Sequence, residues 1–365
     1  MLIGLLWFCF LVIILYWVWF YHAFSSVSTE AKICNPKEKI SEPVSVIISF
    51  KNAAGHIVKT VESILLQDYP AFEIIAIDDF SSDGGSEILQ KIHDKRLCVF
   101  KAALNLPGKK SALTQAIGCA KYDLLLFTDG DCLPASPRWI SSMVQNISVN
   151  TGLELVLGYS PMEKTARWLN GMVRYETILT AIQYITYALA GMPYMGVGRN
   201  MMYRKSLFHK VRGFESHAAL ASGDDDLFVR SAAQTGNTTI NINPDSFIYS
   251  EGKSSVSSFL QQKSRHISTS IKYSLKHRFW LGLFAACQVG FYGCLFMALC
   301  FGYLSVITFI GWLVVKWTVQ IMLQRKAFVI LDGRDLTWWF PLLDIGMAVY
   351  YVILPFYAMV SRRDW

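Results

Sequence analysis

Two carboxylates one residue apart follow an apolar run in the segment LLLFTDGDC, residues 124–132. Residues i and i+2 of an extended chain point the same way, so Asp129 and Asp131 can converge on one point, and Gly130 lets the backbone come close. Hard divalent cations such as Mg²⁺ and Mn²⁺ take oxygen ligands and often keep positions for water and substrate phosphates. The spacing therefore indicates a candidate cation site, although a strand followed by an acidic turn would carry the same residues.

A second acidic group consists of three adjacent residues, Asp224, Asp225 and Asp226. Residues 226–234 have a helical pattern, and carboxylates at the start of a helix are stabilised by its dipole. A capped helix explains part of this pattern, but it does not require three acids in a row. Crowded carboxylates raise one another's pKa, which suits one of them to act as a general base.

The elements that must position these acids are short apolar strands that alternate with helices. Residues 44–50 and 72–79 are predicted to be buried parallel strands, and the second ends in Asp78 and Asp79. Helical spacing after each strand and short connecting loops predict a doubly wound α/β sheet. Ligands of such sheets bind at the carboxyl ends of the strands, where Asp79 and Asp129 both fall. Shorter strands are expected at 99–100, 153–159 and 200–203, and a helix is expected at 87–93.

The composition separates a membrane part from this sheet, because 53% of the residues are hydrophobic and the mean hydropathy is +0.33. Residues 1–24 predict a retained membrane anchor, since a cleaved signal peptide would begin with a charged segment. Lys32, Lys37 and Lys39 follow this anchor, so the positive-inside rule places the N-terminus outside and the next domain in the cytosol.

The C-terminal part predicts three further spans. Residues 279–323 fit a hairpin of two spans that breaks near Gly302, residues 324–339 a polar loop, and residues 340–360 a last span. Lys316 inside this hairpin is expected to snorkel to the interface or to contact a lipid headgroup. Four spans would leave the C-terminal tail outside, whereas its two arginines favour the inside, and the orientation of the last segment stays open.

Other features of the chain narrow the class of protein. The aromatic-rich amphipathic stretch 167–190 fits a helix on the membrane surface or a helix that covers the sheet. The eight cysteines have no Cys-x-x-Cys spacing and are read as reduced, small core residues. The net charge of +7 comes without a basic, aromatic-interleaved stripe, which argues against a nucleic-acid partner.

The order of these segments resembles that of the membrane-bound family 2 glycosyltransferases with the GT-A fold, over about residues 44–266. VSVIISFKN is similar to the first strand of that family and IDDFSSDGG to its nucleotide-binding segment. GKKSALTQAI resembles the G-K-x-x-A-L-N segment of that family, TDGDC its metal motif, GDDDLFVR its acid motif, and Gln262 with Arg265 its Q-x-x-R-W motif. The resemblance implies a GT-A doubly wound mixed sheet with flanking transmembrane helices.

Several residues would contact the sugar nucleotide if the family pattern holds. They are Asp78, Asp79, Lys109, Lys110, Asp129, Gln262 and Arg265. The resemblance assigns Asp78 and Asp79 to the base and ribose, and Lys109 or Lys110 to a phosphate. It assigns Gln262 and Arg265 to the leaving pyrophosphate.

The metal and the base are implied in the same way. Asp129 would face the ribose and the metal, and Asp131 would bind Mg²⁺ or Mn²⁺ directly. Counting from the end of the acid motif puts the base at Asp224, whereas aligning the paired acids favours Asp225, and Asp226 completes the candidate set. The chain departs from the family at Gly223, where a Glu is usual, and at His266, where a Trp is associated with processive synthases.

The resemblance implies an inverting, metal-dependent transfer from a nucleotide sugar, with a UDP-sugar favoured, to a lipid-linked or saccharide acceptor near the membrane lipids. It divides the chain into an anchor (1–24), a linker (25–42), a GT-A catalytic domain (43–252), a juxtamembrane segment (253–278) and a C-terminal membrane region (279–365). The expected location is the inner or plasma membrane, with the catalytic domain in the cytosol. A non-catalytic scaffold that keeps the fold and a subunit of a processive polysaccharide synthase are the alternatives.

Overall fold

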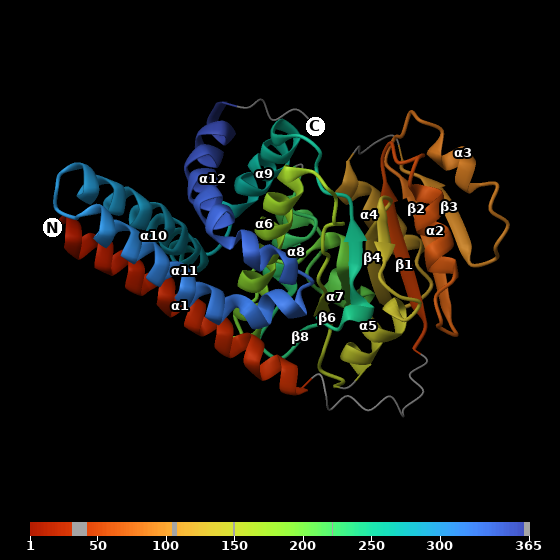
Figure 1. Ribbon diagram of the computed structural model, residues 1–365. Coiled ribbons are helices and arrows are strands. Elements are labelled where there is room, and N and C mark those ends of the chain that lie inside the picture. Colours follow the sequence, from red (N-terminus) through yellow and green to blue (C-terminus); the bar gives the residue numbers. More distant parts are fainter. Residues whose placement is uncertain (31–41, 104–107, 149, 221, 361–365) are drawn as a thin grey trace. The chain divides into compact units, whose positions relative to one another are not determined.

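The computed structural model describes residues 1–30, 42–103, 108–148, 150–220 and 222–360. These residues form two compact units (Figure 1). One unit combines 1–30 with 164–186 and 252–360, and the other combines 42–163 with 187–251. Most of the predicted linker and the last five residues lie outside the described residues.

The unit formed by 42–163 and 187–251 is built on a seven-stranded mixed sheet in the order β3-β2-β1-β4-β7-β6-β8 (Figure 1). The strands β1 to β4 are parallel, β7 is antiparallel to β4 and β6, and β8 is parallel to β6. Their bounds are β1 Val44–Phe50, β2 Phe72–Asp78, β3 Leu97–Lys101, β4 Leu124–Asp129, β6 Leu155–Leu157, β7 Met201–Arg204 and β8 Thr238–Ile240. A separate two-stranded sheet pairs β5 Cys132–Pro134 with β9 Ile248–Ser250. The predicted mixed α/β sheet is confirmed.

Helices cover both faces of the large sheet because alternate strand residues point to opposite faces. On one face, Val46 and Ile48 of β1 pack in a core with α2 Ile57–Leu65 and α5 Trp139–Ser148. On the other face lies α4 Lys109–Cys119, which contacts β1 and β2. Shorter helices complete the unit: α3 Gly85–Leu89, η1 Gly198–Asn200, α7 Lys205–Lys210, η2 Glu215–His217, α8 Asp226–Ala232 and η3 Pro244–Ser246.

Element boundaries differ from the sequence predictions where backbone geometry intervenes. The second strand ends at Asp78, because Phe80 has a left-handed φ of 58° that turns the chain. The helix predicted at 87–93 runs from Gly85 to Leu89, and the strand predicted at 153–159 is paired only over Leu155–Leu157.

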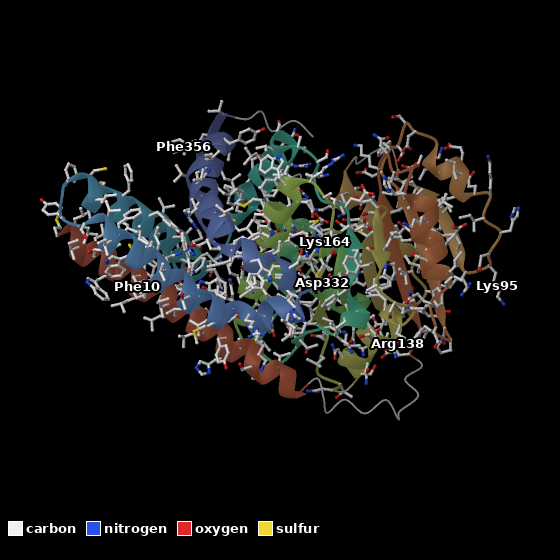
Figure 2. All side chains as sticks on the ribbon, in the orientation of Figure 1. Phe10, Lys95, Arg138, Lys164, Asp332 and Phe356 are labelled. Atoms are coloured by element: carbon white, nitrogen blue, oxygen red, sulfur yellow. The ribbon has the colours of Figure 1, made fainter. Side chains whose placement is uncertain are left out.

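The other unit contains four helices long and apolar enough to cross a membrane. They are α1 Leu2–Glu30, α10 Leu275–Cys300, α11 Val306–Ile330, and α12 Phe340–Val360 with η4 Arg334–Trp339 before it. α1 lies along α10 and α11 (Figure 1). Large apolar side chains stay exposed on these helices, as Phe356 of α12 does (Figure 2), which suits a lipid environment.

The structure confirms the predicted break between the paired helices and overturns the predicted loop after them. The break near Gly302 is confirmed, since α10 ends at Cys300 and Gly302 has a left-handed φ of 72°. The polar loop predicted from residue 324 is wrong, because α11 continues to Ile330. Its buried residues Gln320, Gln324 and Phe328 recur every four positions, so one inward face extends through the polar segment.

The prediction that Lys316 snorkels to the interface is also wrong. Its side chain is completely buried among α10, α11 and α12, where its ammonium group bonds the Asp344 carboxylate. Tyr292 donates a hydrogen bond to the same carboxylate, and Trp317 Nε1 donates to the Tyr292 hydroxyl at 3.0 Å. Burial of a charge requires such partners, so the partner on α12 explains why Lys316 points inward.

The amphipathic stretch 167–190 forms α6 Trp168–Leu189. In the part up to residue 186, Tyr175 packs against the rings of Phe328 and Phe340. Arg174 binds both oxygens of Asp335 at 2.8 and 2.9 Å. This part of the helix therefore packs against the C-terminal helices. The sequence had suggested the membrane surface or the sheet as its partner.

Candidate active site

The turn between β4 and β5 carries the paired carboxylates. Asp129 is the last residue of β4, and Gly130 and Asp131 form the turn that follows. A Cβ atom on Gly130 would lie 2.6 Å from Cβ of Phe50 and 3.0 Å from Cδ1 of Ile57. Only glycine fits this close approach, so the packing against β1 and α2 fixes a tight turn with an acid on each side.

The ligand atoms of Asp129, Asp131 and Cys132 lie within 4.8 Å of one another. Sequence reasoning did not single out Cys132, which is fully buried and donates from its thiol to Oδ1 of Asp131 at 3.4 Å. Burial, followed by the charges of Asp129 and Asp131, raises the pKa of this thiol well above its usual range. Hard cations take oxygen ligands, so the two carboxylates are the groups of this cluster that fit Mg²⁺ or Mn²⁺. All seven described cysteines are free.

Lys109, the first residue of α4, links the two acid motifs. Its Nζ lies 2.8 Å from Oδ1 of Asp129 and 3.1 Å from Oδ2 of Asp224. Burial opposes the charge on Lys109, but the attraction of Asp129, Asp224 and Asp225 outweighs it and holds the pKa well above its ordinary value. The carboxylates of Asp129 and Asp224 therefore share one positive group.

The three adjacent acids have different surroundings. Asp224 is 14% exposed and bonds Lys109. Asp225 is the N-cap of α8, where its carboxylate accepts from the backbone N–H of Asp226 at 2.7 Å and of Gly198 at 3.3 Å. Burial, and then the charges of Asp224 and Asp226, raise the pKa of Asp225 to about 7. Asp226 is 3% exposed and accepts from Leu227 N–H.

A pocket opens at the carboxyl ends of β1 and β4, with about 260 Å³ of empty space including the solvent at its mouth. Lys109, Asp129 and Asp224 line it, together with Ser49 and Gly198. Asp129 and Lys109 are the pocket residues predicted for the donor, and Asp224 is the one predicted for the base. Within the described residues, the sheet therefore brings the metal motif, the lysine segment and the acid motif to one pocket.

The second lysine of this segment points elsewhere. Lys110 is 9% exposed, and its ammonium group donates to the backbone oxygens of His217 at 2.5 Å and of Ser222 at 3.3 Å. It also donates to the backbone oxygen of Leu220. Its contacts are therefore with the chain that leads into the acid motif.

The carboxylates at the end of β2 are both buried. Asp78 accepts from Ser81 N–H at 2.8 Å, which closes the turn after the strand. Asp79 accepts from Gly108 N–H at 3.1 Å and so ties this turn to the residue before α4. The structure therefore places Asp79 beside the start of the helix that carries Lys109.

Gln262 and Arg265 lie on α9 Val256–Ser270, which belongs to the unit of apolar helices. In that unit, Lys263 bonds Glu176 of α6 at 2.5 Å. The role of Gln262 and Arg265 toward a pyrophosphate stays a prediction.

The loop before β7 supplies residues that sequence reasoning missed. Gly198 N–H bonds Asp225, and a Cβ on Gly198 would lie 3.2 Å from Cβ of Asp225. Arg199 follows and donates from Nε to the Ser160 hydroxyl at 2.6 Å. The glycines of the segment GMPYMGVG were the available signal, because close approach of the backbone to a neighbouring side chain favours glycine.

Comparisons with known proteins place this geometry in a family. The family described as Glycosyl transferase family 2 matches residues 45–212, and that described as Glycosyl transferase family group 2 matches residues 152–359. The second match covers more than half of the chain.

Two curated relatives match shorter parts. The UDP-Glc:alpha-D-GlcNAc-diphosphoundecaprenol beta-1,3-glucosyltransferase WfaP of Escherichia coli is 35% identical over 105 residues, which are 29% of this chain and 39% of that protein. The Poly-beta-1,6-N-acetyl-D-glucosamine synthase of Staphylococcus aureus (strain MSSA476) is 29% identical over 150 residues, which are 40% of this chain and 33% of that protein. The matches thus span between a third and two fifths of these relatives.

A solved structure shares the fold along most of its length. The mannosyltransferase PcManGT from Pyrobaculum calidifontis, in complex with GDP-Man and Mn²⁺, superposes with a TM-score of 0.53 at 16% identity. The superposition covers 94% of this chain and 99% of that one. This likeness concerns the fold.

Proposed function

Because the chain belongs to the family 2 glycosyl transferases, we propose that it transfers a sugar from a UDP-sugar to a lipid-linked or saccharide acceptor at the membrane. The observation that carries this proposal is the ammonium group of Lys109 between Asp129 and Asp224. It joins the carboxylate of the metal motif to the carboxylate of the acid motif within one pocket. A donor phosphate and an acceptor hydroxyl must meet at such a place for a sugar to pass between them.

The donor side of the pocket handles negative charge. Asp129 and Asp131 would hold Mg²⁺ or Mn²⁺, which when bound would neutralise the diphosphate that leaves. Lys109 adds a permanent positive charge that can bond a phosphate oxygen. Asp78 and Asp79 at the end of β2 are proposed to orient the ribose and base.

The acceptor side needs a base, and we assign that role to Asp224. Geometry favours it over Asp225, because Asp224 lines the pocket while the Asp225 carboxylate accepts two backbone N–H groups. Asp224 takes the proton of the acceptor hydroxyl while the oxygen of that hydroxyl forms a bond to the anomeric carbon. The bond from that carbon to the diphosphate oxygen breaks at the same time. One displacement inverts the configuration at the anomeric carbon.

The apolar helices and one relative bear on the acceptor and on the location of the protein. Within the described residues, four helices could cross a membrane, and the name of the Escherichia coli relative specifies UDP-Glc and a diphosphoundecaprenol-linked acceptor. These observations support a UDP-sugar and a lipid-linked acceptor for this chain. The lysines at 32, 37 and 39 support a cytosolic catalytic domain, proposed at residues 43–252.

A ligand panel tests the donor and the metal together. The full-length protein in detergent is heated with UDP-, GDP-, CMP- or dTDP-sugars, each with and without Mn²⁺, and the unfolding midpoint is recorded. A ligand that binds only the folded state raises this midpoint. We expect a rise with a UDP-sugar that depends on Mn²⁺ and disappears in Asp131→Ala. A rise with another nucleotide would overturn the UDP assignment, and no rise with any of them would contradict the proposed donor site.

A further inference from the structure

We propose that Lys110 is a positioning residue: through three backbone carbonyl groups it holds the chain that delivers Asp224 to the pocket. The proposal rests on the function above, in which Asp224 is the base. It gives Lys110 a task different from the phosphate contact expected from the sequence.

The ammonium group of Lys110 is withdrawn from water, and within the described residues its hydrogen bonds go to backbone oxygens. Its acceptors are the carbonyl oxygens of His217, Leu220 and Ser222. Among the ion pairs of the described residues, none includes Lys110. Burial lowers the pKa of Lys110, against the attraction of Asp224 and Asp226. A buried charge is tolerated only with such hydrogen bonds, so the three carbonyl groups must stay converged around it.

The position of these carbonyl groups in the chain explains the effect on the site. Ser222 precedes Asp224 by two residues, and Gly223 between them has a left-handed φ of 97°. A carbonyl group fixed at Ser222 and a defined turn at Gly223 leave the Asp224 side chain little freedom of direction. If Lys110 lost its charge, the carbonyl groups of His217, Leu220 and Ser222 would lose their shared hydrogen-bond donor. The last of these groups lies only two residues before Asp224.

Lys109 and Lys110 divide the work at the start of α4. Successive residues of an α-helix point about 100° apart, since one turn takes 3.6 residues. Lys109 therefore reaches the side chains of Asp129 and Asp224, and Lys110 reaches the backbone that precedes Asp224. The first turn of α4 thus contacts Asp224 in two ways. Lys109 binds its carboxylate, and Lys110 binds the main chain that precedes it.

The test compares Lys110→Met with two matched variants. Lys110→Arg keeps a charged donor for the carbonyl groups. Lys205→Met is the control, because Lys205 also donates to two backbone carbonyl groups, those of Gly118 and Ala120, but at the other end of α4. Each full-length protein is assayed for kcat and donor KM, for donor affinity by calorimetry, and for amide hydrogen exchange.

We expect Lys110→Met to lower kcat about 10- to 100-fold, as a misplaced group does, while donor KM and donor affinity change less than about threefold. Exchange should become faster in peptides from 213–226 and not elsewhere. Lys110→Arg should restore both, and Lys205→Met should change neither. If Lys110→Met does not fold, Lys110→Gln, which keeps one amide donor, is measured against the same thresholds.

Two results would overturn the proposal. Unchanged kcat and unchanged exchange would show that Lys110 positions nothing, and weaker donor binding at unchanged kcat would identify a phosphate contact instead. A wild-type protein that transfers no sugar would contradict the proposed function alone. The exchange of peptides 213–226 would then still decide whether Lys110 holds this chain.

Discussion

At the scale of single residues, Asp225 couples the site to pH. Its neighbours are two further acids and the ammonium group of Lys109, and burial with the adjacent acids raises its pKa to about 7. In the unfolded chain an aspartate titrates near 3.9. Between these values the folded protein holds a proton that the unfolded chain has lost. The contribution of Asp225 to the free energy of unfolding therefore falls as the pH rises from about 4 to 7.

The variant Asp225→Asn removes this titration. We expect wild type to lose stability relative to Asp225→Asn as the pH rises from 5 to 8, because only wild type must ionise a crowded acid. The measurement is the unfolding midpoint of the detergent-solubilised proteins at half-unit pH steps, with Asp68→Asn on the exposed surface as control. Parallel pH profiles for wild type and Asp225→Asn would contradict the raised pKa.

Gly223 occupies a position where a glutamate is usual in the glycosyltransferase family, and the backbone conformation explains the glycine. Its φ is 97°, and a Cβ atom there would lie 2.7 Å from Cδ1 of Leu227. We expect Gly223→Ala to lower the free energy of unfolding by about 1–3 kcal/mol. The matched change Gly118→Ala in α4, where a Cβ meets nothing within 4 Å, should be neutral or stabilising. Denaturant unfolding measures both, and equal costs would contradict the strain.

At the scale of elements, sequence periodicity predicts the long buried strands well. β1 has the predicted bounds and β4 begins at the predicted Leu124, because a continuous apolar run is typical of a buried parallel strand. The short strands and α3 are less well predicted, since partners distant in sequence decide where their pairing ends.

The candidate site also has features that the sequence predicts and features that it does not. The paired acids of the metal motif and the acid motif could be identified from residue types and spacing. The separate tasks of Lys109 and Lys110 could not, because the carbonyl groups that hold Lys110 lie more than 100 residues away. The inward direction of Lys316 also depends on Asp344, which is 28 residues away on the next helix.

The packing of α11 against α12 rests partly on that buried pair. Removing one member leaves an uncompensated charge, so Lys316→Met should lower the free energy of unfolding by about 3–5 kcal/mol. Replacing both, in Lys316→Met with Asp344→Leu, should recover most of the loss. The control is Lys326→Met on the same helix, whose Nζ lies 3.5 Å from a backbone oxygen. Unfolding in a detergent titration measures all three, and a double variant as unstable as Lys316→Met would contradict the pairing argument.

At the scale of the whole molecule, the chain joins a sugar-transferase sheet to four helices that could cross a membrane. We propose that this combination keeps the catalytic unit at the bilayer, where a lipid-linked acceptor would be found. Five of the apolar residues exposed on α12 illustrate the surface available to lipid: Leu342, Val349, Phe356, Met359 and Val360. The proposed function assigns the chemistry to the sheet unit and an acceptor held in lipid to the neighbourhood of the helices.

The most direct test of the account is the release of UDP from a UDP-sugar by the purified full-length protein with Mn²⁺ and a membrane-lipid extract as acceptor. Wild type, Asp131→Asn and Asp224→Asn are compared, and transfer is followed by radiolabel in the lipid fraction. We predict repeated turnover by wild type and a loss of at least about 100-fold in each variant, with donor binding kept in Asp224→Asn. Transfer by either variant at the wild-type rate would contradict the assignment of Asp131 as metal ligand or of Asp224 as base.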